Sequence, residues 1–346
     1  MAYSSIVKPG DYFNNKIYTG TGSSNALTGV GFQPDWTWIK KRSGAGSHSL
    51  FDSVRGVTKL ISSNTTSAEA TLSGGLTAFG TDGFTVGSDG DVNGNSATYV
   101  SWNWLAGTTS GLSGGTITPS AYSINATSGF GIYKYTGTGS AGTIAHGLGK
   151  VPKMIIVKPT STTGPWVCYH VAIGNDKGIV LNTTAAEYSN SNWASTTPTT
   201  SVISLRAGGD VNTSSETYIA YVFCDVEGYS KIGSYTGNGN ADGTFVYTGF
   251  KPAWVMFKRF DSTSNWIVFD SKRGVHNLND NYLYPNANGA EGTSSSSGVD
   301  LLSNGFKQRN TYADANTSTG TYIYMAFAEN PFVADDSGTA VPVVAG

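Results

Sequence analysis

A pattern that occurs three times constrains the fold of this chain most. The pentapeptide Tyr-Thr-Gly-(Thr/Asn)-Gly begins at Tyr18, Tyr135 and Tyr235. Each copy is followed by a proline and, six residues after it, by a lysine, in the pairs Pro34/Lys40, Pro152/Lys158 and Pro252/Lys258. The residues between are mostly apolar or β-branched, which favours a half-buried strand, and proline suits the first residue of a strand. The glycines before it favour a turn.

The three copies remain aligned further along the chain. Trp166 and Trp266 open a second strand at matching places, where the first copy has Leu50 and Phe51. Each copy closes on an Asp-x-Asn group and a tyrosine six residues after the asparagine. These pairs are Asn93/Tyr99, Asn212/Tyr218 and Asn316/Tyr322. A period of about 100 residues exceeds the roughly 20–50 residues of a solenoid unit, so the pattern indicates a triplicated domain.

The pattern of apolar residues predicts strands rather than helices. From Tyr99 to Trp104, polar and apolar residues alternate, which predicts a strand with one face inward. Only Ser67–Leu72 and Thr184–Tyr188, each with an Ala-Glu pair, could form one turn of helix. Short strands separated by Gly, Asn and Asp turns predict an all-β chain of three tandem antiparallel β-sandwich domains of jelly-roll type.

The predicted boundaries follow the repeats. We expect an N-terminal arm, a β-domain, a Gly/Ser/Thr-rich linker, two further β-domains and a C-terminal tail. In that order the segments are 1–16, 17–106, 107–128, 129–227, 228–333 and 334–346. Because the linker separates only the first two domains, the second and third should pack tightly, with the first domain freer.

Composition excludes several classes of protein. Aromatic residues make up 12% of the chain and need a core, which argues against disorder. The net charge is −2 without a basic run, so nucleic acid is not an expected partner. No stretch approaches the ~20 apolar residues of a membrane helix, and the N-terminus lacks the pattern of a signal peptide. Cys168 and Cys224 are expected to be free and buried, with a bridge inside the middle domain as the alternative.

Candidate catalytic and metal-binding groups are few. The segment Asp89–Gly94 begins like a calcium loop, but Val100 stands where the loop needs a glutamate, so a turn is favoured. Two Asp-x-x-Arg-Gly steps favour local salt bridges over a glycosidase carboxylate site, and the middle copy has His170 to Gly174 instead. Their ion pairs would be Asp52/Arg55 and Asp270/Arg273. We therefore expect no enzyme activity, metal or cofactor.

The histidines and the glycosylation sequons receive no functional role from the sequence. The histidines lack metal-ligand spacing and are expected to be core or loop residues. They are His48, His146, His170 and His276. Asn-x-Ser/Thr sequons occur by chance in a chain this rich in Asn, Ser and Thr. Among them are Asn64, Asn125, Asn182, Asn212 and Asn316.

Large aromatic side chains in polar, loop-like segments are the candidate ligand-binding groups. Tyr188 and Trp193 lie in the segment AEYSNSNWAS, and Tyr282 and Tyr284 lie in NDNYLYPN. Exposed aromatic rings in a polar setting stack on sugar faces and anchor protein interfaces. The alternative is that these four rings fold back into the core.

Four segments carry a resemblance to a known kind of protein. They are the YTGxG turn with its Pro-to-Lys strand, the D-x-x-R-G step, the closing TYIYMAFAENPF and the opening MAYSSIVKPGDYFNNKIYTGTG. Together they resemble a domain of virion proteins of tailed bacteriophages, especially marine ones, over nearly the whole chain up to about Val333. The resemblance implies a tail-fibre-like part on the tail or capsid surface, and it brings no catalytic residues.

Our first hypothesis is therefore a non-enzymatic virion protein that contacts other virion proteins and binds a glycan or protein of the host surface. The alternative is a capsid decoration, cement or head-fibre protein that binds neighbouring virion subunits. A glycan depolymerase is the third hypothesis, and it would require two facing carboxyl groups.

The sequence also predicts an assembly. Phage fibres of the kind it resembles usually use threefold symmetry, and cyclic symmetry is the common solution for oligomers, so we expect a homotrimer. Light scattering of the purified chain should return about three times the 36.2 kDa of one chain. A single chain at micromolar concentration, with no larger species on the particle, would contradict this prediction.

Overall fold

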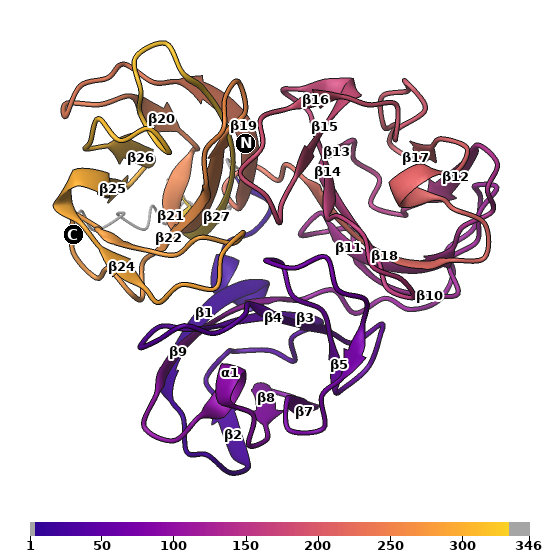
Figure 1. Ribbon diagram of the computed structural model, residues 1–346, viewed down its shortest axis with the longest axis horizontal. Coiled ribbons are helices and arrows are strands. Elements are labelled where there is room, and N and C mark those ends of the chain that lie inside the picture. The colour runs from indigo at the N-terminus through magenta and orange to yellow at the C-terminus, as the bar shows by residue number, and fades with distance from the viewer. Residues whose placement is uncertain (1–3, 332–346) are drawn as a thin grey trace.

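The computed structural model describes residues 4–331, which form an all-β fold of several antiparallel sheets. Three lobes, residues 13–106, 107–227 and 228–331, surround a common centre (Figure 1). The tail predicted at 334–346 lies outside the described residues. Within residues 4–331, no helix has the length and apolar character needed to cross a membrane.

Each lobe contains one main sheet, and four strands of each main sheet have equivalent order and pairing. The order is β1–β9–β3–β4 in the first lobe, β11–β18–β13–β14 in the second and β19–β27–β21–β22 in the third. The bounds are β1 Phe13–Thr19, β3 Trp36–Lys41, β4 Ser49–Asp52, β9 Thr98–Trp104, β11 Phe130–Thr136, β13 Pro152–Pro159, β14 Val167–His170, β18 Thr217–Cys224, β19 Ser230–Thr236, β21 Phe250–Arg259, β22 Trp266–Asp270 and β27 Thr321–Pro331. The first and last strands of each repeat are therefore neighbours.

A small sheet packs over the outer face of each main sheet. Its strands are β2 Asn25–Thr28, β8 Gly83–Val86 and β7 Leu76–Gly80 in the first lobe, β12 Gly142–Ala145 and β17 Val202–Leu205 in the second, and β20 Phe245–Tyr247, β26 Gly305–Gln308 and β25 Val299–Leu302 in the third. Further strands extend the second main sheet or form two-stranded ladders. They are β10 Ala121–Asn125, β15 Gly174–Val180, β16 Tyr188–Ser189, β5 Lys59–Leu60 with β6 Ala70–Thr71, and β23 Asn281–Tyr282 with β24 Gly292–Thr293. Helical turns are short: η1 Pro9–Asp11, α1 Gly90–Asn93, η2 Gly209–Val211 and η3 Ser295–Ser297.

Both faces of each main sheet are buried, which corrects the prediction of one inward face. In β3, Trp36 and Trp38 point into a core shared by all three lobes, whereas Ile39 points into the core of the first lobe. In β9, every residue from Tyr99 to Trp104 is buried. The shared core is apolar, and its large residues include Trp36, Trp38, Trp102, Trp104, Trp166, Trp254, Trp266, Phe223 and Phe327. The near-continuous apolar runs of these strands follow from this double burial.

An asparagine holds the first turn of every repeat, which gives the sequence pattern its physical reason. Its side-chain oxygen accepts the N–H of the residue after Tyr-Thr-Gly, at 2.8–3.0 Å, in the pairs Thr21/Asn93, Thr138/Asn212 and Asn238/Asn316. A side chain at Gly20 would place its Cβ 2.2 Å from the Gly94 carbonyl oxygen, so only glycine fits. Asn212 and Asn316, which received no role as glycosylation sequons, are thus turn anchors.

The paired tyrosines of the repeat stack on each other across the first and last strands. Their ring centroids lie 4.9–5.2 Å apart, in the pairs Tyr18/Tyr99, Tyr135/Tyr218 and Tyr235/Tyr322. The tyrosines that define the repeat therefore occupy equivalent places in the three lobes. Pro152 and Pro252 also pair with equivalent residues, whereas Pro34 lies before the start of β3. In the first lobe, Asp89 caps α1 by accepting the Asp91 N–H, which confirms the turn interpretation of that segment.

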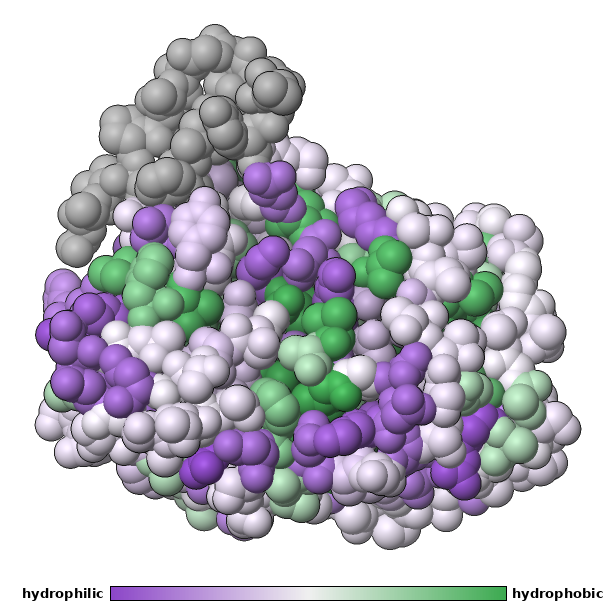
Figure 2. Space-filling view, turned by 90° about the horizontal axis from the view of Figure 1, so that it is seen from above, coloured by the Kyte–Doolittle hydropathy of each residue, from purple (hydrophilic) through white to green (hydrophobic). Residues whose placement is uncertain are grey.

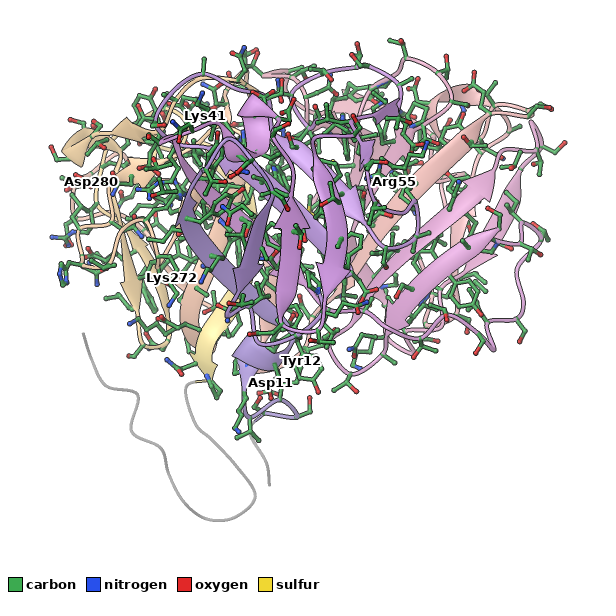
Figure 3. The ribbon with its side chains drawn as sticks, turned by 90° about the horizontal axis from the view of Figure 1, so that it is seen from below. Asp11, Tyr12, Lys41, Arg55, Lys272 and Asp280 are labelled. Carbon is green, nitrogen blue, oxygen red and sulfur yellow. The ribbon has the colours of Figure 1, made fainter. Side chains whose placement is uncertain are left out.

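Two segments are more closely attached than predicted. Residues 107–128, predicted as a linker, contain β10, which pairs with β11, and the Thr108 and Ile124 backbones bond each other. In the arm predicted at 1–16, Ile6 is buried in the shared core, and β1 already begins at Phe13. Because the linker and the arm both supply buried side chains, neither behaves as a tether. Figure 3 shows Asp11 and Tyr12 at the opposite end of the molecule from Lys41, where β3 ends.

Candidate functional site

Several buried charged groups lie where the lobes meet. The three lysines of the sequence repeat make the same kind of contact in each lobe. Each ammonium group is fully buried and donates to a backbone carbonyl of a neighbouring lobe: Lys40 to Asn288, Lys158 to Thr66 and Lys258 to Thr184, at 3.2–3.5 Å. Each also donates to the carbonyl of the next residue in the chain. Burial lowers the pKa of each of these lysines to about 8. Lobe one thus contacts lobe three, lobe two contacts lobe one and lobe three contacts lobe two, which closes a ring.

The Ala-Glu segments run across the same three boundaries as extended chain, so the prediction of helical turns there is wrong. The Glu69 N–H donates to the Thr160 carbonyl and the Glu187 N–H donates to the Phe260 carbonyl. A third Ala-Glu pair, unnoticed in the sequence, completes the ring, because the Glu291 N–H donates to the Arg42 carbonyl. Backbone hydrogen bonds to the next lobe replace the bonds that a helix would have made.

The two Asp-Arg pairs are local salt bridges, as predicted, and they are also part of the lobe boundaries. Both side chains of each pair are fully buried. The Tyr221 hydroxyl of the second lobe donates to Asp52 at 2.7 Å, and the Trp102 indole of the first lobe donates to Asp270 at 2.9 Å. Figure 3 shows Arg55 where the first lobe meets the second. Both carboxylates are paired with side chains inside the protein and are not exposed at its surface.

The middle copy departs from the Asp-Arg pattern because its partner differs. His170 occupies the place of Asp52 and Asp270, and the residue equivalent to Trp102 and Tyr221 is Met325, which has no donor. The His170 Nδ1 accepts the Ala172 N–H, so Nε2 carries the proton and donates to the Tyr324 carbonyl at 3.3 Å. Burial lowers the pKa of His170 to about 4, with the hydrogen bond to Tyr324 opposing it. A neutral imidazole thus replaces an ion pair.

A histidine also replaces a tryptophan at the lobe boundaries. Trp166 and Trp266 donate their indole N–H to Ser62 and Val180 of a neighbouring lobe. The first lobe places His48 there, four residues before Asp52, and its Nε2 bonds the Tyr284 carbonyl at 3.0 Å. His48, and not Leu50 or Phe51 as predicted, is therefore the residue of the first lobe that is equivalent to Trp166 and Trp266. Asn64, Asn182 and Asn286 each accept the N–H of this residue, which gives two of the sequons a structural role.

The other two histidines and the two cysteines differ in their exposure to solvent. His146 is buried in the second lobe and His276 is exposed in the third. Cys168 and Cys224 are free and buried, as predicted. Over residues 4–331, no group of three or more His, Cys, Asp or Glu side chains is arranged to hold a metal ion.

Two of the four predicted binding aromatics belong to a packed arrangement in the third lobe. Tyr282 and Tyr284 lie 5.0 Å apart between ring centroids and pack against the core of that lobe. The Tyr284 hydroxyl lies 3.3 Å from that of Tyr312. Both residues are partly exposed.

Trp193 is not accessible, which corrects its assignment as a ligand-binding residue. Its side chain is only 1% exposed and packs edge-on against Tyr169, at 5.7 Å between centroids, in the core of the second lobe. The polar residues around it in the sequence suggested a surface loop. The chain there turns the indole inward, because the core between β13 and the small sheet needs a large apolar group.

Tyr188 lines an open pocket of about 520 Å³ on the second lobe, and this pocket is the candidate functional site. The other lining residues are Asp176, Ser189, Asn190, Ser191 and Arg206. The Asn190 amide donates to the Tyr188 hydroxyl at 2.8 Å, and the Asn190 N–H donates to the Asp176 carbonyl. Burial raises the pKa of the Tyr188 hydroxyl, and Asn190 opposes that shift.

Arg206 gives the pocket a cationic side chain that makes few hydrogen bonds within the protein. Within the described residues its guanidinium donates one long hydrogen bond, from Nε to the Ala207 carbonyl at 3.4 Å. The exposed Asp176 and the partly buried Asn190 line the same pocket. The pocket therefore combines an aromatic ring with planar groups that donate and accept hydrogen bonds in pairs.

The aromatic ring of the pocket is specific to the second lobe. In the second lobe, Tyr188 on β16 pairs with Gly178 on β15. In the third lobe the arrangement is reversed, because Tyr282 lies on the first strand, β23, and pairs with Gly292 on β24. In the first lobe the equivalent pair is Leu60 and Ala70. One large side chain thus covers a small neighbour in each ladder.

Sequence reasoning found Tyr188 but missed Asp176, Asn190 and Arg206. They are common polar residues on three separate segments, and nothing in their spacing connects them. The glycine at 178, within a run of strand residues, was the one available signal that a ring lies across the ladder.

Comparison with known proteins places the chain in a family without assigning a function. A family model described as a domain of unknown function, DUF7483, matches residues 8–331. The chain belongs to this family. The match spans all three repeats of the chain. No curated protein and no solved structure matches the chain.

The hydrogen bond from Tyr221 to Asp52 should contribute measurably to stability. Tyr221→Phe leaves a buried carboxylate short of one donor, so we expect the free energy of unfolding to fall by about 1.5–3 kcal/mol. Tyr229→Phe is the matched control, because the Tyr229 hydroxyl is buried and has no hydrogen-bond partner within the described residues. Urea unfolding of both variants checks this. Equal losses would contradict a specific role for the bond between lobes.

The buried lysines should make stability increase with pH. Below pH about 8 these lysines are charged in the folded and in the unfolded chain. Between pH about 8 and the ordinary lysine pKa of 10.5, only the unfolded chain holds the proton. The free energy of unfolding therefore increases as the pH rises through this range. From neutral pH to about 9.5 each lysine should add about 1–2 kcal/mol.

Unfolding by urea over this pH range should show the increase, and Lys158→Met should remove about one third of it. The exposed Lys272 provides the control variant Lys272→Met, which should keep the full increase. A profile that is the same for Lys158→Met and for the unaltered chain would rule out the lysines as its source.

Proposed function

We propose that this chain is a non-enzymatic virion surface protein whose second lobe binds a saccharide of the host surface. The Tyr188 pocket carries the proposal. A half-buried tyrosine beside Asp176, Asn190 and Arg206 offers an apolar ring for the face of a sugar and planar polar groups for its hydroxyls. An open pocket of this kind suits a weakly buried, strongly hydrated ligand better than an apolar cofactor.

The fold supports a binding role for the pocket. Three lobes closed around a shared aromatic core form a rigid support, and binding residues concentrate on segments that such a support presents. The face over the second and third lobes is mostly of intermediate hydropathy, with separate hydrophilic and apolar patches (Figure 2). Such a surface favours contacts by hydrogen bonding over electrostatic attraction of a charged polymer.

The virion location rests on the resemblance of the repeat to phage virion domains. Other virion proteins are the expected partners, and the tail or capsid surface is the expected place. The jelly-roll character of each repeat is part of the same proposal, and it is supported by the small sheet that packs over each main sheet. A decoration or head-fibre role is the alternative, in which the lobes contact virion subunits instead of a saccharide.

The carboxylates considered for glycoside cleavage do not favour the depolymerase hypothesis. Asp52 and Asp270 are fully buried and each is held by its own arginine. Glycoside hydrolysis needs two carboxyl groups that face the substrate. We therefore keep recognition without cleavage as the proposal.

Binding of the purified full chain to an array of bacterial surface glycans tests the proposal. Tyr188→Ala removes the ring under the sugar, and loss of such an anchor typically costs about 2–4 kcal/mol, so binding should weaken more than tenfold. Tyr282→Ala is the matched control, because it also uncovers a ladder glycine but lies outside the pocket. It should retain binding and show a similar melting temperature.

The result that overturns the proposal is equal glycan binding by Tyr188→Ala and the unaltered chain, or no glycan binding at all. Adsorption of particles carrying each variant extends the test to the host cell. Normal adsorption together with loss of particle stability would favour the decoration role. Release of cleaved glycan by the chain would establish the depolymerase instead.

A further inference from the structure

The outer edge of the small sheet differs among the three lobes, although the strands are equivalent. β2, β12 and β20 each pair on one side only with a strand of their own sheet, as edge strands. An open edge exposes backbone N–H and C=O groups that can pair with another strand, and proteins usually protect such edges. How each lobe treats this edge therefore bears on what binds there.

In the second lobe, the chain itself covers the edge. The N–H groups of Thr116 and Ile117 donate to the Thr143 carbonyl of β12 at 2.8 and 2.9 Å, and Gly115 forms a bridge with Ile144. Residues 115–117 thus lie against β12, held by one isolated bridge and by two hydrogen bonds to a single carbonyl. The edge of this lobe accepts backbone contacts from another segment of chain.

In the third lobe, the same edge is open and aromatic. Phe245 and Tyr247 point outward from β20 and are 43% and 60% exposed, while Val246 between them points into the core. Within residues 4–331, no backbone hydrogen bond reaches 245–247 except those from β26. The residues at the equivalent outward positions are small: Ala26 and Thr28 in the first lobe, Thr143 and Ala145 in the second.

We propose that the β20 edge is an interface that pairs with β20 of a second copy of this chain. Antiparallel pairing about a twofold axis through Val246 sets Phe245 of one copy opposite Tyr247 of the other. It therefore makes two aromatic cross-strand pairs on one face, each of a kind that stabilises sheets. A twofold interface of this sort uses the same patch on both copies.

The charges around the two aromatic rings suit such self-association. Asp242 pairs with Lys307 at 2.6 Å and with Arg309 at 3.3 Å, and Arg309 also pairs with Asp300 at 3.4 Å. Two carboxylates and two cations balance, so two identical patches meet without net repulsion. A partner carrying a strong charge of one sign would gain nothing from this rim.

Sedimentation velocity of the full chain over a wide concentration range tests the proposal. We expect a reversible dimer, and the double variant Phe245→Ala/Tyr247→Thr, which installs the residues of the first lobe, should raise the dissociation constant more than tenfold. Hydrogen exchange should also slow for those amides of 245–247 that do not bond β26, in the dimer but not in the variant. Both positions are exposed, so the variant should melt as the unaltered chain does.

Val275→Thr is the control, because Val275 is also an exposed apolar residue of the third lobe but lies off this edge. Dimerisation should persist in it. A chain that sediments at 36.2 kDa throughout overturns the proposal, as does a dimer that survives the double variant. A trimer unaffected by the variant would support the assembly expected from the sequence and exclude this interface.

Discussion

Burial of both faces of the three main sheets is the constraint on which the rest of the structure depends. An antiparallel sheet usually leaves one face to water, but here the inner faces meet in a shared aromatic core and the outer faces are covered by small sheets. Once the inner faces are dry, the polar groups at the lobe boundaries need internal partners. The boundary lysines, the Ala-Glu segments and the indole N–H groups provide them.

The same contacts, repeated at three boundaries, close the ring within one chain. Such head-to-tail contacts generate rings when the rotation closes, and here the covalent chain fixes the number of units at three. The replacement of an Asp-Arg pair by His170 opposite Met325 shows that the boundaries are not identical in chemistry. Each boundary keeps its charged side chains paired or hydrogen-bonded, because an unmatched charge in this core would be costly.

A closed ring of three lobes with equivalent strand order lets individual lobes differ at their surfaces at little cost to the fold. The second lobe places Tyr188 and Arg206 around an open pocket, while the third lobe places Phe245 and Tyr247 on an open strand edge. These two surfaces lie on different lobes, so the proposed saccharide binding and the proposed association of copies need not compete. The two-stranded ladders give another example of such a difference between lobes. The large side chain, Tyr188, lies on the second strand of the ladder in the second lobe, whereas Tyr282 lies on the first strand in the third lobe.

The sequence by itself determined the triplication, the all-β class, the turn at each Tyr-Thr-Gly and the salt bridges of Asp52 and Asp270, because these depend on local spacing. It also named Tyr188 as one of four candidate ligand-binding aromatic residues. Only the tertiary structure decided that Trp193 is buried, that the Ala-Glu segments are extended and that His48 takes the place of a tryptophan. Each of these depends on groups from another lobe or from distant strands. Asp176, Asn190 and Arg206 likewise become one site only when separate segments meet, and a single sequence carries no signal of that meeting.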